Sequence, residues 1–231
     1  MFILLSVAIA PALALLSYFY LRKEIAKEPS KLLLHTFIYG AILTFPILFI
    51  QHVIQEEQIF SSLFIRHVLI TSLLEEFFKW LVLLIAIFNH VEFDDPYDGI
   101  LYGVSVSLGF ATVENILYLL NFGMDEAFMR ALLPVSSHAL FGVVMGYYFG
   151  RAKFTTFNKS RYEIIYALGG ALILHITYNS ILIFTGLELM LMVPFMLFLW
   201  IFGLSKVKKA HILSRKKRFE HHEYFIKEKS S

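Results

Sequence analysis

The chain has 231 residues, of which 58% are hydrophobic and 16% are charged, and its mean hydropathy is +0.69. This composition is typical of a protein that crosses the membrane several times. The sequence contains no cysteine, which excludes disulfides, thiol nucleophiles and zinc sites built on cysteine. The formal net charge of +2 carries little information alone, because the basic residues are unevenly placed along the chain.

Hydropathy predicts an all-α fold: a polytopic membrane helix bundle of about seven transmembrane helices, each roughly 20 residues long. The expected spans are approximately residues 2–21, 32–54, 68–88, 97–120, 126–150, 163–184 and 187–204. The first has no positively charged segment before it, so we interpret it as a retained span and not as a cleaved signal. No loop is long enough for a soluble domain, so any chemistry must lie among the helices.

The basic residues orient this bundle. Four lie between the first and second spans, four between the fifth and sixth, and nine after the last, whereas the opposite side has only Arg66 and Arg130. The positive-inside rule therefore predicts an N-terminus outside and a C-terminus in the cytoplasm. We expect a transmembrane domain over residues 1–205 and a basic cytoplasmic tail over 206–231. A basic run at this position serves topology and contact with the lipid bilayer, so no nucleic-acid partner is expected.

Two adjacent carboxylates and a lysine, Glu75, Glu76 and Lys79, lie inside the third expected span. A charge at that depth costs about 3 kcal/mol on insertion scales, so the cluster is a functional-site hypothesis. Lys79 lies one helical turn from both acids and can partly neutralise either. Adjacent carboxylates cannot both ionise cheaply in a low dielectric, which suits general acid–base catalysis. A buried polar cluster that only locks helices together explains this stretch equally well.

Each of the next three expected spans carries polar residues of its own. These are Glu114 and Asn115, with Phe110 one turn earlier, in the fourth span, His138 in the fifth, and His175 and Asn179 in the sixth. Taken singly, each has an ordinary explanation, since amides hold neighbouring transmembrane helices together and an aromatic ring packs.

Depth in the membrane connects these residues. At 1.5 Å per residue, Glu75 and Glu114 lie roughly 10 Å below the outer ends of their spans. His175 and His138 come out roughly 13 and 16 Å deep by the same calculation. Residues on helices of alternating direction thus converge on the outer half of the bilayer, which favours one functional site over four unrelated contacts.

The convergent residues are compatible with two kinds of chemistry. Three carboxylates and two histidines could ligate zinc, which accepts imidazole and carboxylate donors. The helical zinc signature His-Glu-x-x-His is absent, however, and Lys79 beside the acids opposes a dication. We therefore expect a site without a cofactor, in which a glutamate activates water and histidine and asparagine groups stabilise the oxyanion, although zinc is not excluded.

Three motifs resemble those of a known family. They are Glu75-Glu76-x-x-Lys79, Phe110-x-x-x-Glu114-Asn115 and His175-x-x-x-Asn179, with His138 between the last two. Together they resemble the motifs of the PrsW intramembrane proteases, relatives of the CAAX-prenyl protease and bacteriocin-immunity superfamily. The resemblance covers nearly the whole chain, including residues 10–20 and 97–103. The wider superfamily often has Glu-Glu-x-x-Arg and a histidine in place of Glu114.

This resemblance implies a membrane-embedded peptidase, with residues 1–205 as the protease domain, in a bacterial cell membrane. It implies the first (site-1) cleavage of a single-span partner, an anti-sigma factor, on its extracytoplasmic side, which begins the release of an envelope-stress sigma factor. We expect Glu75 as the general base and Glu76 as its proton-sharing partner or the group that orients Lys79. The other residues assigned to the site are His175 (catalytic) and Lys79, Glu114, His138, Asn179, Phe110 and Asn115 (supporting).

Two other functions use the same residues. The first is a proton-coupled transporter or channel, in which the acids and histidines form a proton relay. The sequence shows no inverted repeat and no pair of broken spans in corresponding positions, which weakens this alternative. The second is a scaffold that keeps the polar core without chemistry.

Overall fold

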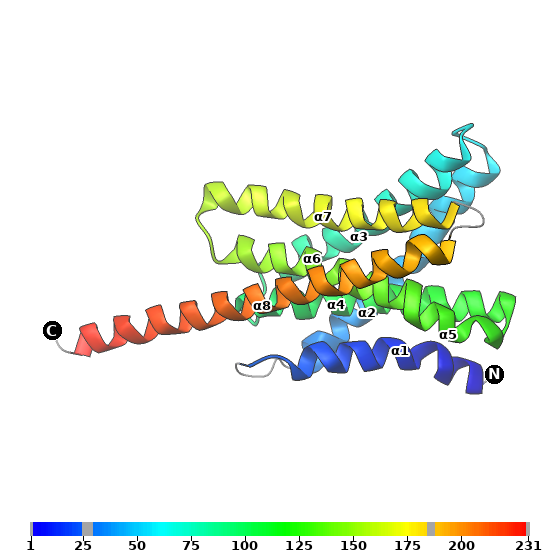
Figure 1. The fold of residues 1–231 in the computed structure, drawn as a ribbon. Helices are drawn as coiled ribbons and strands as arrows, with labels where there is room; N and C mark the ends of the chain where they lie inside the picture. The colour runs from blue at the N-terminus through cyan, green and yellow to red at the C-terminus, as the bar shows by residue number, and fades with distance from the viewer. Residues whose placement is uncertain (1, 25–29, 184–187, 230–231) are drawn as a thin grey trace.

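The computed structural model describes residues 2–24, 30–183 and 188–229, and over these ranges it is a bundle of helices without a strand (Figure 1). In chain order the elements are α1 (Phe2–Leu21), α2 (Ser30–Glu56), η1 (Ile65–Ile70), α3 (Thr71–Val82), η2 (Leu83–Ile87), α4 (Pro96–Phe122), η3 (Met124–Glu126), α5 (Ala127–Arg130), η4 (Ala131–Val135), α6 (Ser136–Lys153), α7 (Phe157–Ile183) and α8 (Glu188–Lys229). The segments η1, η2 and η4 are π-helical, and η3 is a 3₁₀ turn. The expected all-α fold is confirmed.

Six helical stretches in the described ranges are long and apolar enough to cross a membrane. They are Phe2–Leu21, Ser30–Glu56, Pro96–Phe122, Ala127–Lys153, Phe157–Ile183 and Leu189–Glu220. They match six of the seven expected spans and support a multi-pass membrane protein. The helices extend beyond the apolar stretches: α7 begins at Phe157 and not near residue 163, because polar residues continue its first turns.

The remaining expected span is the helical run from Ile65 to Ile87. Its α-helical part, α3, has only 12 residues and is flanked by the π-helical turns η1 and η2. The run does not count among the six because it is divided and carries several charged residues. Of these, Glu75, Glu76 and Lys79 are buried, and α3 packs against α7 and α2. The charged face of this helix is therefore turned towards protein and not towards lipid.

Helix α4 is the centre of the bundle and packs against α6, α2, α1 and α8. It begins with a capping box formed by Asp95 and Asp98, and the residues from its first turn to its middle are buried. Small residues in α4 allow close approach of neighbouring helices. A Cβ atom on Gly103 would lie 2.4 Å from the carbonyl oxygen of Gly142, so the backbones of α4 and α6 touch. This tight pair holds together the two helices that carry Glu114 and His138.

Helix α8 has 42 residues and extends beyond the other helices at its C-terminal end (Figure 1). It passes through residue 205, the expected boundary between the transmembrane domain and the basic tail, without a break. The tail therefore continues the last span as one helix, and the division into two parts stays a prediction.

Candidate active site

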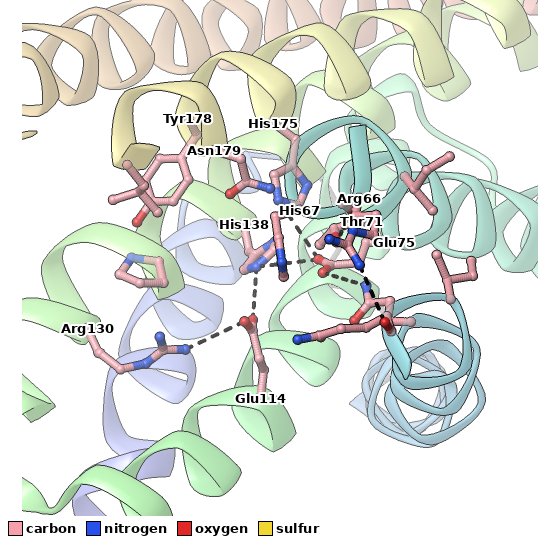
Figure 2. A pocket seen from close by; sticks show the side chains of 16 residues that line it. Arg66, His67, Thr71, Glu75, Glu114, Arg130, His138, His175, Tyr178 and Asn179 are labelled. Carbon is pink, nitrogen blue, oxygen red and sulfur yellow. Dashed lines mark hydrogen bonds and ion pairs between the residues drawn. The ribbon is translucent and has the colours of Figure 1, made fainter. Parts of the chain in front are cut away.

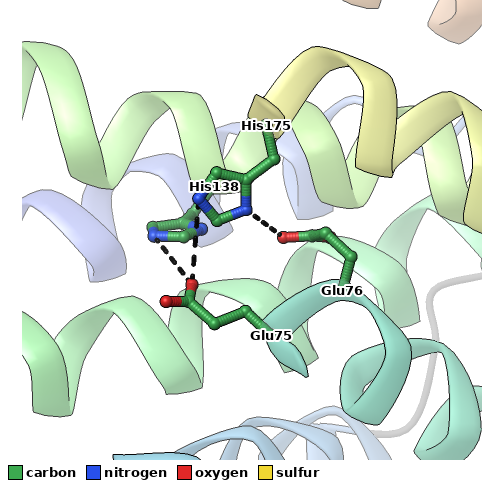
Figure 3. A group of neighbouring side chains, drawn as sticks. All are labelled: Glu75, Glu76, His138 and His175. Atoms are coloured by element: carbon green, nitrogen blue, oxygen red, sulfur yellow. Dashed lines mark hydrogen bonds and ion pairs between the residues drawn. The ribbon is translucent and has the colours of Figure 1, made fainter. Parts of the chain in front are cut away.

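Four polar side chains from three helices meet in the interior of the bundle. They are Glu75 and Glu76 from α3, His138 from α6 and His175 from α7 (Figure 3). All four are buried, and one nitrogen or oxygen atom from each lies within 4.8 Å of the others. The structure thus brings together the residues that the depth calculation placed at one level of the membrane.

Glu76 is the anchor of this cluster. Its Oε1 accepts hydrogen bonds from Lys79 Nζ and from His175 Nδ1, each at 2.9 Å. Glu76 and Lys79 are both fully buried, so each depends on the other for the compensation of its charge. Glu76 does not line the cavity that opens over the cluster, which is described below. Its geometry suits an orienting role towards His175 and Lys79, one of the two roles expected from the sequence.

Glu75 faces the cavity instead. Its Oε1 accepts a hydrogen bond of 3.2 Å from Gln51 Nε2 on α2. Its Oε2 is buried and has no hydrogen-bond partner. The ring nitrogens His138 Nε2 and His175 Nε2 each lie 3.9 Å from this oxygen, too far for a direct bond but with room for a shared ligand atom between them. Glu76 Oε2 is also buried without a hydrogen-bond partner, so Glu75 differs from Glu76 in that it lines the cavity.

The partners of the two histidines assign their protons. Lys79 Nζ lies 3.1 Å from His138 Nδ1, and an ammonium group only donates, so Nδ1 accepts and Nε2 donates to Glu114 Oε2 at 3.1 Å. In His175, Nδ1 donates to the Glu76 carboxylate. The lone pair of His175 Nε2 is therefore left free and turned towards Glu75 Oε2.

A cavity of about 280 Å³ opens over this cluster (Figure 2). The predicted site residues that line it are Glu75, Glu114, His138, His175 and Asn179. Asn179 Nδ2 donates a hydrogen bond of 3.0 Å to Ser72 Oγ, which fixes the amide on the α3 side of the cavity. The cavity has room for an extended peptide segment and a water molecule.

Two other predicted residues lie beside the cavity without lining it. Phe110 packs its ring 4.3 Å from Lys79 Nζ and 5.5 Å from the His138 ring, so it covers the buried ammonium group. Asn115 turns away from the cluster, because its Nδ2 donates to the Ala8 carbonyl on α1 at 2.9 Å. It connects α1 to α4, as expected for an amide that holds helices together.

The structure adds residues that the sequence did not place in the site. The additional lining residues include Gln51, Arg66, Thr71, Arg130 and Tyr178. Arg130 Nη2 lies 3.7 Å from Glu114 Oε1, and its Nε donates to Asn115 Oδ1 at 3.0 Å. The sequence signal that could have pointed to Gln51 is its polar side chain inside the second apolar span. Arg66 and Arg130 contributed only to the predicted orientation of the bundle.

Comparison with known proteins identifies similar chains. The family described as "PrsW family intramembrane metalloprotease" matches residues 28–203. A Bacillus subtilis protein named Protease PrsW is 49% identical over 211 residues, which cover 91% of this chain and 96% of that protein. The protein of the same name from Geobacillus kaustophilus is 50% identical over 210 residues, or 91% and 93% of the two chains. The one from Clostridioides difficile is 29% identical over 218 residues, or 90% and 92%. No solved structure matches the chain.

The description of the matched family implies a metal, and the donor atoms fit one in part. Glu75 Oε2 is a buried oxygen without a partner, and the free lone pair of His175 Nε2 is directed at it. Imidazole and carboxylate are donors that zinc accepts. His138 Nε2 fits only in its other tautomer, because the Lys79 contact to Nδ1 places the ring proton on Nε2. Our expectation of a site without metal therefore stays a prediction.

Proposed function

The chain belongs to the PrsW family of intramembrane proteases, and from this premise we propose that it makes the first cleavage of a membrane-spanning anti-sigma factor. The cut would lie on the extracytoplasmic side of a single-span substrate and would lead to the release of an envelope-stress sigma factor. We place the enzyme in the bacterial cell membrane. The alternative of a proton-coupled transporter is not favoured, because the matched family and relatives are proteases.

The observation that carries a hydrolytic function is the free Oε2 of Glu75. This oxygen is buried, lacks a hydrogen-bond partner and borders a cavity large enough for a peptide segment. Its other oxygen is held by Gln51, so the carboxylate is fixed in orientation. A general base must be aimed at the proton that it removes. Glu76 Oε2 also lacks a hydrogen-bond partner, but Glu76 does not line the cavity, whereas Glu75 does.

We infer that water bound between Glu75 Oε2 and His175 Nε2 is the nucleophile. Both atoms accept hydrogen bonds, so they can orient the two protons of one water molecule. As the water oxygen bonds to the scissile carbonyl carbon, Glu75 takes one of these protons. Glu75 then gives the proton to the leaving amine nitrogen while the carbon–nitrogen bond breaks. One water molecule is consumed, and the carboxylate is regenerated.

The negative charge on the former carbonyl oxygen needs hydrogen-bond donors. Asn179 Nδ2 is the candidate donor at the cavity, because Ser72 uses only one of its two protons. His138 Nε2 can donate to this oxygen only by leaving Glu114 Oε2. From the sequence we expected His175 as a donor beside Asn179, but the hydrogen bond to Glu76 favours an acceptor role for His175 Nε2. If a metal is bound, Glu75 and His175 would hold it, together with His138 in its other tautomer, and it would supply Lewis-acid polarisation of the carbonyl.

Reconstitution with a single-span anti-sigma factor tests the proposal. Purified protein and substrate are combined in liposomes, and the products are identified by mass spectrometry. We expect a single early cut in the extracytoplasmic part of the substrate, and no cut with Glu75→Gln. The proposal is wrong if the wild-type protein binds the substrate without cleaving it, or if the cut falls in the cytoplasmic part. Proton flux across the same liposomes tests the transporter alternative.

A further inference from the structure

A second cavity, of about 420 Å³, lies between the C-terminal end of α1 and helix α8. It is at the N-terminal end of α4, because His211 on its wall stacks on Tyr97 with ring centroids 4.5 Å apart. Tyr97 in turn donates a hydrogen bond of 2.8 Å to the Phe19 carbonyl on α1. Glu114 follows Tyr97 by almost five helical turns, roughly 25 Å along α4. This cleft is therefore separate from the candidate active site.

The walls of the cleft change character along α8. Leu204 and Val207 lie at the end nearer the membrane span, and Lys208 and Arg215 follow on the same side of the helix. Arg22 contributes a further cation from the end of α1. An apolar wall that passes into a basic one is complementary to an amphiphile with an acyl chain and an anionic headgroup.

The cations of the cleft exceed its acids. Glu24 is bound by Arg215 through two hydrogen bonds of 2.8 Å. Among the described residues, neither Arg22 nor Lys208 forms an ion pair, and the Arg22 guanidinium lies over the Tyr18 ring at 4.7 Å. Within the described residues, two positive charges at the cleft therefore have no acidic partner.

Basic residues of α8 act on Glu24, which lies outside the spans. The hydrogen bonds from Arg215 hold the pKa of the Glu24 carboxyl below its usual range, and the charges of His211, Arg215 and Arg218 act in the same direction. Arg218 borders an adjoining cavity that Glu24 and Arg215 also line. Positive potential thus extends along α8 beyond the single ion pair.

We propose that this cleft binds the phosphate headgroup of an anionic phospholipid, with an acyl chain along its apolar wall. Basic pockets between transmembrane helices are suited to such headgroups, and guanidinium groups bind phosphate through paired hydrogen bonds. The lipid would join α1 and α8, which both pack on α4. This binding goes beyond the proposed peptidase activity and is independent of it.

Native mass spectrometry of the full chain, titrated with phosphatidylglycerol in a nonionic detergent, tests the proposal. We expect one saturable site that phosphatidylcholine does not fill. Each of Arg22→Gln and Lys208→Gln should weaken binding about fivefold, and the double variant about thirtyfold. Glu24→Gln should have the opposite effect and strengthen binding, because it releases Arg215. Thermal unfolding in detergent alone shows that each variant is folded.

Lys209→Gln is the matched control, since Lys209 is the exposed neighbour of Lys208 on the same helix and does not line the cleft. Equal loss of binding in the Lys208 and Lys209 variants would mean diffuse attraction to the whole tail and would overturn the proposal. Glycerol phosphate that binds as tightly as the lipid would overturn the assignment to a phospholipid. The absence of a saturable site would overturn it as well.

Discussion

Replacement of Gln51 by leucine tests how the catalytic carboxylate is held. Gln51 lies on α2, outside the three recognised motifs, yet its Nε2 donates to Glu75 Oε1 at 3.2 Å. Leucine has a similar volume and makes no hydrogen bond, so the change removes the donor while the cavity wall is kept. Among the described residues, the Gln51 bond is the one hydrogen bond of the Glu75 side chain, so without it the carboxylate can rotate away from the nucleophilic water.

The expected size of the effect follows from the strength of this bond. A hydrogen bond to a charged group contributes about 1.5–3 kcal/mol. If this energy is lost in the transition state, the turnover number falls about 10- to 150-fold. The Michaelis constant should change little, because Gln51 acts on Glu75 and not on the substrate backbone.

The assay measures turnover and substrate capture by the same purified variant in liposomes. Gln55→Leu is the matched control, because Gln55 lies one turn later on α2 and lines the same cavity, whereas among the described residues the hydrogen bond from α2 to Glu75 comes from Gln51. We expect near-normal turnover for this variant. If Gln51→Leu is folded and as active as Gln55→Leu, the orientation of Glu75 does not depend on α2, and the positioning argument fails.

The remaining predictions concern the cluster itself. Glu75→Gln should lower cleavage by at least about 10²-fold without loss of folding, and near-normal activity would contradict its role as the base. Asn179→Ala should raise the activation barrier by up to about 3–4 kcal/mol as a lost oxyanion donor, and His175→Ala should lower turnover strongly because the water loses an acceptor; substrate pull-down is kept in both. Poor stability with full specific activity would instead indicate a structural role for both. Lys79→Met should lower thermal stability, since removal of one partner of a buried ion pair costs about 3–5 kcal/mol; an unchanged melting temperature would refute this. Dialysis against a strong chelator should leave activity intact, whereas stoichiometric zinc that is lost and regained together with activity would show a metalloenzyme.

The position of Lys79 makes the metal experiment informative. Its Nζ lies 2.9 Å from Glu76 Oε1, 3.1 Å from His138 Nδ1 and 3.9 Å from Glu75 Oε2. The ammonium group already supplies a positive charge beside both acids, which a metal would also do. A dication at Glu75 and His175 would be repelled by Lys79 unless the lysine moved or lost its proton. Metal content of the wild type and of Lys79→Met can therefore be compared directly.

The sequence by itself determined the class of the fold and predicted which residues of different helices meet. Hydropathy is a local property, so the span expected over residues 2–21 coincides with α1. Depth along a helix follows from residue spacing alone, and this was sufficient to predict that Glu75, His138 and His175 converge. The motifs that carry these residues also led to the family, which the comparisons confirm.

Tertiary structure decided which atoms face one another. Glu75 and Glu76 are adjacent in the sequence, but only the packed structure shows that Glu75 faces the cavity and Glu76 holds His175. The packed structure likewise shows that Asn115 donates to the Ala8 carbonyl on α1 and is turned away from the cluster. Spacing along a helix sets how deep a residue lies, whereas the rotation of the helix about its axis and the proton positions on its histidines depend on neighbours from distant parts of the chain. The role of Gln51 and the basic cleft between α1 and α8 could therefore emerge only from the packed bundle.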